Sequence, residues 1–252
     1  MIKQATMKYS NVFFLLILIT VCFSACTSGG GDTVVRKAAS APVIDGRMDA
    51  VWNAADWLPI KHIRLSRRNA VYPEDISASF KVMWDTANCY FLFDVKDDVK
   101  FFSNDTGVIE KKFDLKMRDL DGVELFFDPK NQKDAKVDTL SFNYKKFTYN
   151  SDSICTSAST RVNRVVEGIE YFILDTDKGY MLEVKFPWKA LGVKPENNLK
   201  LGFETNVVDN DNRIPYPDML PKKESALAWH DHTRQNPFNM TDIYGTLILK
   251  DK

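Results

Sequence analysis

The sequence predicts an all-β fold, a two-sheet antiparallel β-sandwich with one or two short helices. Apolar side chains recur at every second residue in several segments, which is the period of a half-buried strand. In residues 77–85, Ala78, Phe80, Val82 and Trp84 alternate with residues that are mostly polar. Because each such strand has one apolar face, it must pack that face against a second sheet.

Further segments extend this pattern along the chain. Residues 122–129, 180–188 and 200–209 repeat the alternation. Residues 89–95 are apolar on nearly both faces, as expected for a strand in the middle of a sheet. Helix is predicted only for residues 49–55 and 187–191, one or two turns each, with Pro187 suited to a helix N-terminus.

Residues 1–25 are predicted to be a lipoprotein signal peptide. Lysines precede an apolar run from Val12 to Phe23, which is too short for a membrane-spanning helix of about 20 residues. The sequence Phe23-Ser24-Ala25-Cys26 resembles a bacterial lipobox, and the resemblance implies a lipidated Cys26. The alternative is ordinary signal-peptidase cleavage with Cys26 incidental. Lipidation would anchor the protein in the bacterial cell envelope, at the outer membrane on its periplasmic or surface side.

Two regions are predicted after the signal. Residues 26–41 are small and flexible in composition, so they are expected to form a tether from Cys26. Residues 42–252 contain no second linker, low-complexity tract or repeat, so they are expected to form one domain.

Charge and cysteine content limit the function classes. The chain has 34 Lys and Arg against 34 Asp and Glu, so no basic field exists to attract nucleic acid. If Cys26 carries lipid, Cys89 and Cys155 either form a disulfide in an oxidising compartment or remain as buried thiols. The sequence leaves both possibilities open.

The predicted domain starts with a turn and a short helix. Ile44-Asp45-Gly46 is expected to turn the chain into the sheet, with Gly46 at positive φ. Asp49 is then expected to cap the helix, and Trp52 to cover one end of the sandwich core. An active-site role for Asp45 and Asp49 is the alternative.

The order of these motifs carries a family resemblance. Six segments, residues 42–53, 80–98, 119–129, 179–192, 201–212 and 244–249, follow one another as in carbohydrate-binding module family 9. Its domains are similar to DOMON-like sandwiches, and the resemblance covers the chain from Pro42 onward. It implies a non-catalytic module that captures polysaccharide or oligosaccharide of a xylan-like or glucan-like kind.

The resemblance also implies site residues. In the family, a terminal sugar is held between two tryptophans, beside a glutamate on a strand. Trp229, in the polar segment 225–239, matches one tryptophan, and we predict that its ring is exposed. Glu124 matches the glutamate and is expected to point away from the core, although neighbouring strands alone would also explain a carboxylate there. The other tryptophans, Trp52, Trp57, Trp84 and Trp188, are predicted to be core residues.

Two expected contacts are missing. No tryptophan stands at the second position, near residues 117–118, so Phe113 or Arg118 is predicted to form that wall of the site. Ser141 stands where the family often has an arginine. The sequence therefore does not identify which sugar is bound.

The loop after residue 208 is a candidate metal site. Family 9 domains bind structural calcium, and Asp209 and Asp211 are compatible with Ca²⁺. The spacing lacks the glycine and glutamate of an EF-hand loop, and a plain Asn/Asp turn explains it as well. His230 and His232 would share one face of an extended segment, but solvated loop histidines are favoured over a metal pair.

The favoured function is a membrane-anchored, non-catalytic carbohydrate-binding protein that supports polysaccharide degradation or uptake, with glycan-degrading or uptake proteins as partners. Three alternatives stay open. A glycoside hydrolase would need two carboxylates about 5–9.5 Å apart, and no motif singles out such a pair. A haem-binding DOMON-like module would use Met83 or Met181. A structural partner in an outer-membrane complex would have a decayed sugar cleft.

Overall fold

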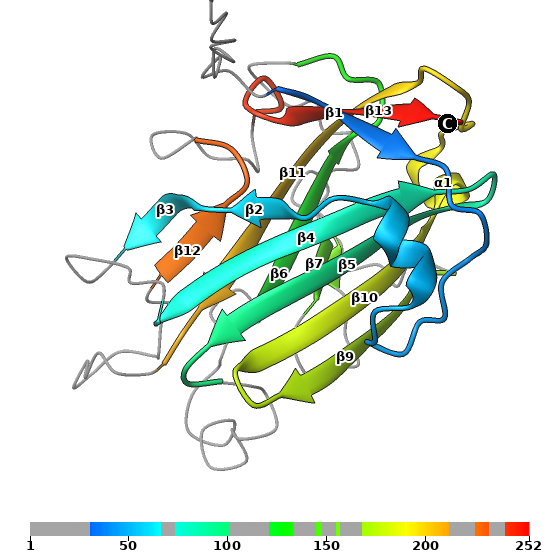
Figure 1. The fold of residues 1–252 in the computed structure, drawn as a ribbon. Coiled ribbons are helices and arrows are strands. Elements are labelled where there is room, and N and C mark those ends of the chain that lie inside the picture. The colour runs from blue at the N-terminus through cyan, green and yellow to red at the C-terminus, as the bar shows by residue number, and fades with distance from the viewer. Residues whose placement is uncertain are drawn as a thin grey trace, which may run out of the picture.

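The computed structural model describes residues 31–66, 74–100, 121–133, 145–147, 155–156, 168–211, 225–231 and 240–251. In these residues, strands form two sheets that lie face to face (Figure 1). The predicted β-sandwich is confirmed, and the named strand pairs are antiparallel except for β1 with β13.

The larger sheet has the order β1-β13-β11-β6-β7-β8, and β12 and β3 continue it beside the second half of β11. Its strands in the described residues are β1 (Asp32–Arg36), β3 (His62–Ser66), β6 (Gly122–Asp128), β7 (Lys145–Phe147), β8 (Cys155–Thr156), β11 (Lys200–Asp209), β12 (Ser225–Ala228) and β13 (Gly245–Lys250).

The smaller sheet has the order β2-β4-β5-β10-β9. Its strands are β2 (Leu58–Ile60), β4 (Ile76–Trp84), β5 (Asn88–Asp97), β9 (Glu170–Thr176) and β10 (Gly179–Pro187). The position of β5 between β4 and β10 confirms that the doubly apolar segment is a central strand.

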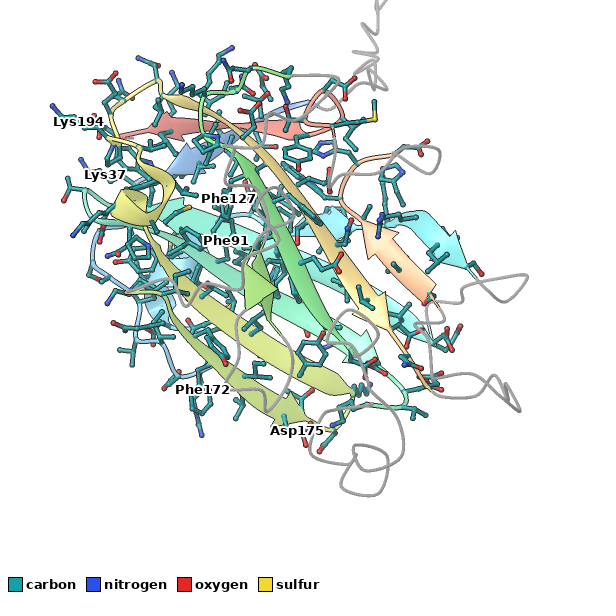
Figure 2. The ribbon with its side chains drawn as sticks, turned by 180° about the vertical axis from the view of Figure 1, so that it is seen from behind. Lys37, Phe91, Phe127, Phe172, Asp175 and Lys194 are labelled. Atoms are coloured by element: carbon teal, nitrogen blue, oxygen red, sulfur yellow. The ribbon has the colours of Figure 1, made fainter. Side chains whose placement is uncertain are left out.

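The core lies between the two sheets, and the predicted alternation fills it. Phe80 and Val82 of β4 and Leu182 and Val184 of β10 are all buried there. Phe91 of β5 and Phe127 of β6 face one another across the core, with ring centroids 6.0 Å apart (Figure 2). Rings from both sheets therefore interdigitate, as close-packed sandwich cores require.

The tether prediction is wrong from Asp32 onward, because β1 lies inside it. β1 pairs in parallel with β13, so that Asp32 lies opposite Thr246 and Arg36 opposite Lys250. Val35 is fully buried in the core. A strand this short shows no clear alternation, and its partner lies at the other end of the chain.

Two short helices are present, as predicted: the 3-10 helix η1 (Ala50–Ala54) and α1 (Trp188–Leu191). Gly46 has φ 77°, and a Cβ there would come within 2.6 Å of Leu174 Cβ. Asp49 stands at the N-cap of η1, but its carboxylate accepts the Val43 backbone N–H at 2.7 Å instead of capping the helix. Asp45 likewise accepts the Arg47 N–H, at 2.9 Å. Both carboxylates close turns, which is a structural role.

Trp52 does not cover the end of the core. It packs with Met83, Tyr90 and Leu92 in a second apolar cluster on the outward face of the smaller sheet. Met83 and Met181, the methionines of the haem alternative, both pack in this cluster.

A buried glutamate fixes this N-terminal segment to the smaller sheet. The Glu183 carboxylate on β10 accepts Asp45 N at 2.9 Å, Gly46 N at 2.8 Å and Trp52 Nε1 at 2.8 Å. Lys81 of β4 adds hydrogen bonds to the Trp52 and Ala55 carbonyls. The Ile-Asp-Gly motif and Trp52 thus both attach the N-terminal segment to Glu183 of the smaller sheet.

The sequence predicted the environments of the remaining tryptophans only partly, and it left the state of the cysteines open. Trp84 and Trp188 are buried as predicted, whereas Trp57 is 39% exposed, with Lys81 Nζ 5.0 Å from its ring centroid. Cys89 is a free, buried thiol. The side chain of Cys155, like Cys26, lies outside the described residues. No helix in the described part of the chain is both long enough and apolar enough to span a bilayer.

Candidate functional site

Glu124 and Asn206 form a polar pair on the outward face of the larger sheet. Val123, Leu125 and Phe127 of β6 face the core, so Glu124 points away from it, as predicted. Asn206 of β11 lies directly opposite Glu124 in the strand register. Its Nδ2 donates to Glu124 Oε2 at 3.1 Å, and Thr205 Oγ1 donates to the Glu124 carbonyl at 2.9 Å.

Asn206 has unused hydrogen-bonding capacity. Both members of the pair are fully buried, yet Asn206 Oδ1 has no hydrogen-bond partner among the described residues. A buried acceptor without a donor costs about 1–3 kcal/mol, and such atoms are rare unless a ligand or water completes them. The sequence did not single out Asn206, although the alternation of β11 places it on the same face as Glu204.

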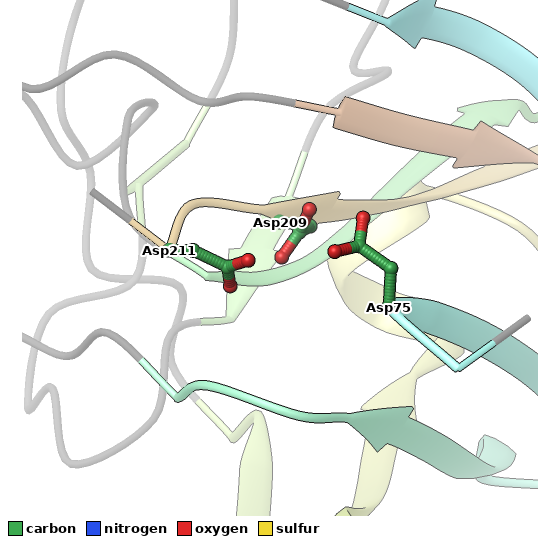
Figure 3. A group of neighbouring side chains, drawn as sticks. All are labelled: Asp75, Asp209 and Asp211. Carbon is green, nitrogen blue, oxygen red and sulfur yellow. The ribbon is translucent and has the colours of Figure 1, made fainter. Parts of the chain in front are cut away.

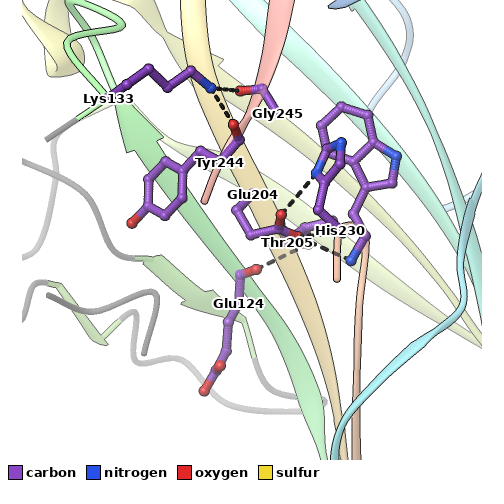
Figure 4. A network of polar contacts seen from close by, with 8 residues as sticks. Glu124, Lys133, Glu204, Thr205, His230, Tyr244 and Gly245 are labelled. Carbon is purple, nitrogen blue, oxygen red and sulfur yellow. Dashed lines mark hydrogen bonds and ion pairs between the residues drawn. The ribbon is translucent and has the colours of Figure 1, made fainter. Parts of the chain in front are cut away.

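A second polar group lies beside this pair (Figure 4). Glu204 Oε2 contacts His230 Nδ1 at 2.9 Å, and Glu204 Oε1 accepts the N–H groups of Thr205 and Trp229 at 2.9 and 3.0 Å. Lys133 Nζ donates to the Tyr244 and Gly245 carbonyls. The interpretation of His230 as a solvated loop histidine is therefore wrong, because its ring is largely buried against Glu204.

The prediction of an exposed Trp229 ring is also wrong. Trp229 is 8% exposed and belongs to the core between the sheets. Its ring lies edge-on to Phe80 at 5.3 Å and packs on Phe203 at 5.8 Å. It points to the side of the larger sheet opposite Glu124, because Leu227 and Trp229 continue the inward alternation of β12. The structure therefore does not bring Trp229 and Glu124 into one cleft.

Several predicted site residues cannot be placed. Phe113, Arg118, Ser141 and His232 lie outside the described residues.

Aspartates from both sheets converge at one end of the sandwich. Asp75 precedes β4, Asp97 ends β5, Asp121 precedes β6, and Asp209 ends β11 with Asp211 two residues later. In each of three triplets drawn from these residues and Asp98, one carboxylate oxygen per residue lies within 4.8 Å of the others. Figure 3 shows three of them: Asp209 and Asp211 at the end of β11, and Asp75 from the segment before β4.

This acidic cluster creates strong local repulsion. Burial raises the pKa of Asp97, and the neighbouring Asp211 and Asp98 carboxylates raise it further. Burial also raises the pKa of Asp209, with Asp97 and Asp75 adding to the rise. Burial, followed by the charges of Asp121, Asp97 and Asp209, raises the pKa of the Tyr180 hydroxyl. Carboxylates this close can all stay ionised only beside a compensating positive charge.

The cluster fits a hard divalent cation. Within the described part of the chain, Asp209 Oδ1 and Asp97 Oδ2 are buried with no hydrogen-bond partner, so carboxylate oxygens remain available as ligands. Ca²⁺ prefers six to eight oxygen ligands at 2.3–2.6 Å. Sequence analysis identified Asp209 and Asp211 but missed Asp75, Asp97 and Asp121, which are distant in the chain and share only their places at strand ends.

Comparison with known proteins identifies the family of this chain. A family model described as "carbohydrate family 9 binding domain-like" matches residues 44–252. The chain belongs to this family. The family 9 resemblance inferred from the six motifs is confirmed.

Relatives of known name share this family 9 domain. Endo-1,4-beta-xylanase A of Thermotoga neapolitana is 26% identical over 220 residues, which is 87% of this chain and 18% of the xylanase. Exoglucanase XynX of Acetivibrio thermocellus is 28% identical over 233 residues, 90% of this chain and 18% of that protein. The chain thus spans less than a fifth of either relative.

A solved structure shares the fold. A family 9 carbohydrate binding module from Caldicellulosiruptor kristjanssonii, in complex with cellotriose, is 22% identical, with a TM-score of 0.67. The similarity covers 88% of this chain and 94% of that one. A module from the same organism, in complex with glucose, has a TM-score of 0.66 and 22% identity.

Proposed function

We propose that this protein binds oligosaccharide or polysaccharide chains around Glu124 and Asn206, on the outward face of the larger sheet. The observation that carries the proposal is the buried Asn206 Oδ1 without a partner, next to the Glu124 carboxylate. A sugar hydroxyl can donate to either oxygen and can also accept from Asn206 Nδ2. Neighbouring hydroxyls on one ring would suit this carboxylate and amide pair.

The substrate class we propose is a β-linked glucan or xylan. Support comes from the family 9 modules that bind cellotriose and glucose, and from the xylanase relatives. Affinity should be in the micromolar to millimolar range, which corresponds to roughly −8 to −4 kcal/mol.

We propose that sugar is bound without cleavage. Hydrolysis needs a second carboxylate that is free to transfer a proton. In the described residues, this face also carries Glu204, whose two oxygens Thr205, Trp229 and His230 already engage. It carries Asp128 as well, whose Oδ2 accepts the Lys133 N–H at 2.9 Å. The activity of the xylanases belongs to proteins of which this chain matches 18%.

We also propose that the mature protein is anchored in the cell envelope by a lipid on Cys26. Since β1 begins at Asp32, the connecting residues can span only about 20 Å. The sandwich would therefore stay close to the membrane. Cys26→Ser should move the protein from the membrane fraction to the soluble fraction, whereas Cys89→Ser should not. Retention of Cys26→Ser in membranes would contradict lipid anchoring.

A calcium ion at the acidic cluster would be held by Asp75, Asp97, Asp121, Asp209 and Asp211. When bound, it would supply positive charge that cross-links strand ends of both sheets. Ser225 and Val99 orient two of these carboxylates, through Ser225 Oγ to Asp209 Oδ2 at 2.6 Å and Val99 N to Asp97 Oδ1 at 3.0 Å.

The sugar site is tested by Glu124→Gln. This change removes a charged acceptor but keeps an oxygen for Asn206 Nδ2, so folding should be preserved. Loss of charge-assisted hydrogen bonds should weaken cellotriose or xylotriose binding about ten- to hundredfold. Isothermal titration calorimetry measures the change, and Glu170→Gln, an exposed carboxylate on β9, is the control. Equal affinity in Glu124→Gln and wild type would refute the site.

A further inference from the structure

The acidic cluster and the Glu124–Asn206 pair are carried by the same two strands. Asp121 directly precedes β6, which carries Glu124, and β11 carries Asn206 and ends at Asp209. Each of these two aspartates is three residues from one member of the pair. Three residues of extended chain span about 10 Å, so an ion at the cluster would act on the pair through the backbone and not by touching the sugar.

Hydrogen bonds already link the strand ends at the cluster. The register places Val208 opposite Gly122 and Asn206 opposite Glu124. Beyond the ladder, Asn210 N donates to Asp121 Oδ1 at 2.7 Å. If Asp121 moved away from Asp209, the paired strands β6 and β11 would shift with them. The distance between Glu124 and Asn206 would therefore change as well.

The cluster also contains independent signs of a ligand. Asp209 is fully buried and Asp97 is 5% exposed, and each has one carboxylate oxygen without a hydrogen-bond partner. Asp97 comes from the smaller sheet and Asp209 from the larger one. When ionised and without a cation, Asp97, Asp121 and Asp209 repel one another and favour separation of the ends of β5, β6 and β11.

We propose that a Ca²⁺ ion at the acidic cluster positions the Glu124–Asn206 pair, so that cation binding and sugar binding strengthen each other. This coupling rests on the proposed sugar site. Asp121 and Asp209 are the positioning residues. The all-oxygen ligand set from four separate segments suits the large and flexible coordination sphere of Ca²⁺ better than the rigid octahedron of Mg²⁺.

The effect follows from preorganisation. A sugar that binds the metal-free protein must also order the ends of β6 and β11, and that cost is removed when the ion is already bound. Linkage requires the effect to be reciprocal. We expect Ca²⁺ to tighten cellotriose binding about 5- to 20-fold, and saturating cellotriose to tighten Ca²⁺ binding by the same factor.

The test is calorimetry on the full chain after chelation, with circular dichroism to confirm that the metal-free protein is folded. Cellotriose is titrated with and without Ca²⁺, and Ca²⁺ with and without cellotriose. Asp211→Asn should weaken Ca²⁺ binding and, at a Ca²⁺ concentration that just saturates the wild type, remove the effect of Ca²⁺ on cellotriose affinity, whereas Asp251→Asn, an exposed carboxylate after β13, should change neither. Asp97→Asn, which reduces the repulsion, provides a second metal-free reference if the chelated wild type unfolds.

The outcomes separate the coupling from the sugar site itself. Glu124→Gln should lose cellotriose affinity while it keeps wild-type Ca²⁺ affinity. Cellotriose binding that depends on Glu124 but is equal with and without Ca²⁺ overturns the coupling and leaves the sugar site intact. Absence of Ca²⁺ binding also overturns the coupling. Failure of cellotriose and xylotriose to bind in saturating Ca²⁺ refutes the proposed function.

Discussion

Glu183 and Glu124 are fully buried glutamates on the outward faces of the smaller and the larger sheet, and their surroundings differ. Glu183 on the smaller sheet accepts three N–H groups from the segment that holds the Ile-Asp-Gly turn and Trp52. Glu124 on the larger sheet accepts an amide from the adjacent strand, and that amide has an oxygen with no partner.

This difference distinguishes a structural carboxylate from a binding one. The donors around Glu183 come from backbone and indole groups that would otherwise be buried and unsatisfied, so the chain itself explains the charge. Beside Glu124, the incomplete amide leaves an acceptor for a molecule from outside the chain. Burial alone does not separate the two cases, since both side chains are 0% exposed; the Asn206 oxygen that no described residue satisfies does.

The largest effect that we expect concerns an aromatic ring rather than a glutamate. Trp229→Ala should lower the free energy of unfolding by about 3–5 kcal/mol, because it leaves a cavity between Phe80 and Phe203. Trp57→Ala, with an exposed ring, should cost less than about 1 kcal/mol. Chemical denaturation measures both.

Sugar binding provides the control for the two tryptophan variants. Folded Trp229→Ala should keep its cellotriose affinity if the binding face depends on Glu124 and Asn206. A folded Trp229→Ala protein that has lost binding at unchanged stability would restore the ring as a sugar contact and would break the contrast between the two faces.

Sequence reasoning succeeded where the signal is local. The alternation of Phe80, Val82 and Trp84 identified the buried face of β4, and residues 200–209 match β11 at both ends. The alternation of residues in β6 also predicted that Glu124 points outward. A period of two depends only on neighbouring residues, so it can be read from a single segment.

The errors arose where the answer depends on distant partners. β1 owes its place to pairing with β13, more than 200 residues later, and the acidic cluster draws on residues from 75 to 211. Trp57 and Trp229 were assigned to the wrong environments because the neighbours of a tryptophan in sequence do not report what its ring packs against. Asn206 was missed because an unsatisfied oxygen is visible only once its surroundings are known.

Smaller effects than that of Trp229→Ala are expected when Glu183 and Glu124 are each exchanged for glutamine. Glu183→Gln replaces one acceptor oxygen with an N–H donor that opposes the N–H groups of Asp45, Gly46 or Trp52. It should lower the free energy of unfolding by about 1–3 kcal/mol and leave cellotriose affinity unchanged. Glu124→Gln should show the reverse, with a change in unfolding free energy within about 0.5 kcal/mol and weakened binding.

Denaturation and calorimetry on the same two proteins would decide this prediction, with Glu170→Gln as the exposed control for both measurements. If Glu183→Gln weakened sugar binding as much as Glu124→Gln did, the two sheets would be coupled and the assignment of binding to one face would be wrong. If Glu124→Gln instead destabilised the fold as much as Glu183→Gln, Glu124 would be a second structural carboxylate. The Asn206 oxygen would then need a partner from within the chain, because a buried acceptor left open in the folded state lowers stability whether or not a sugar ever arrives.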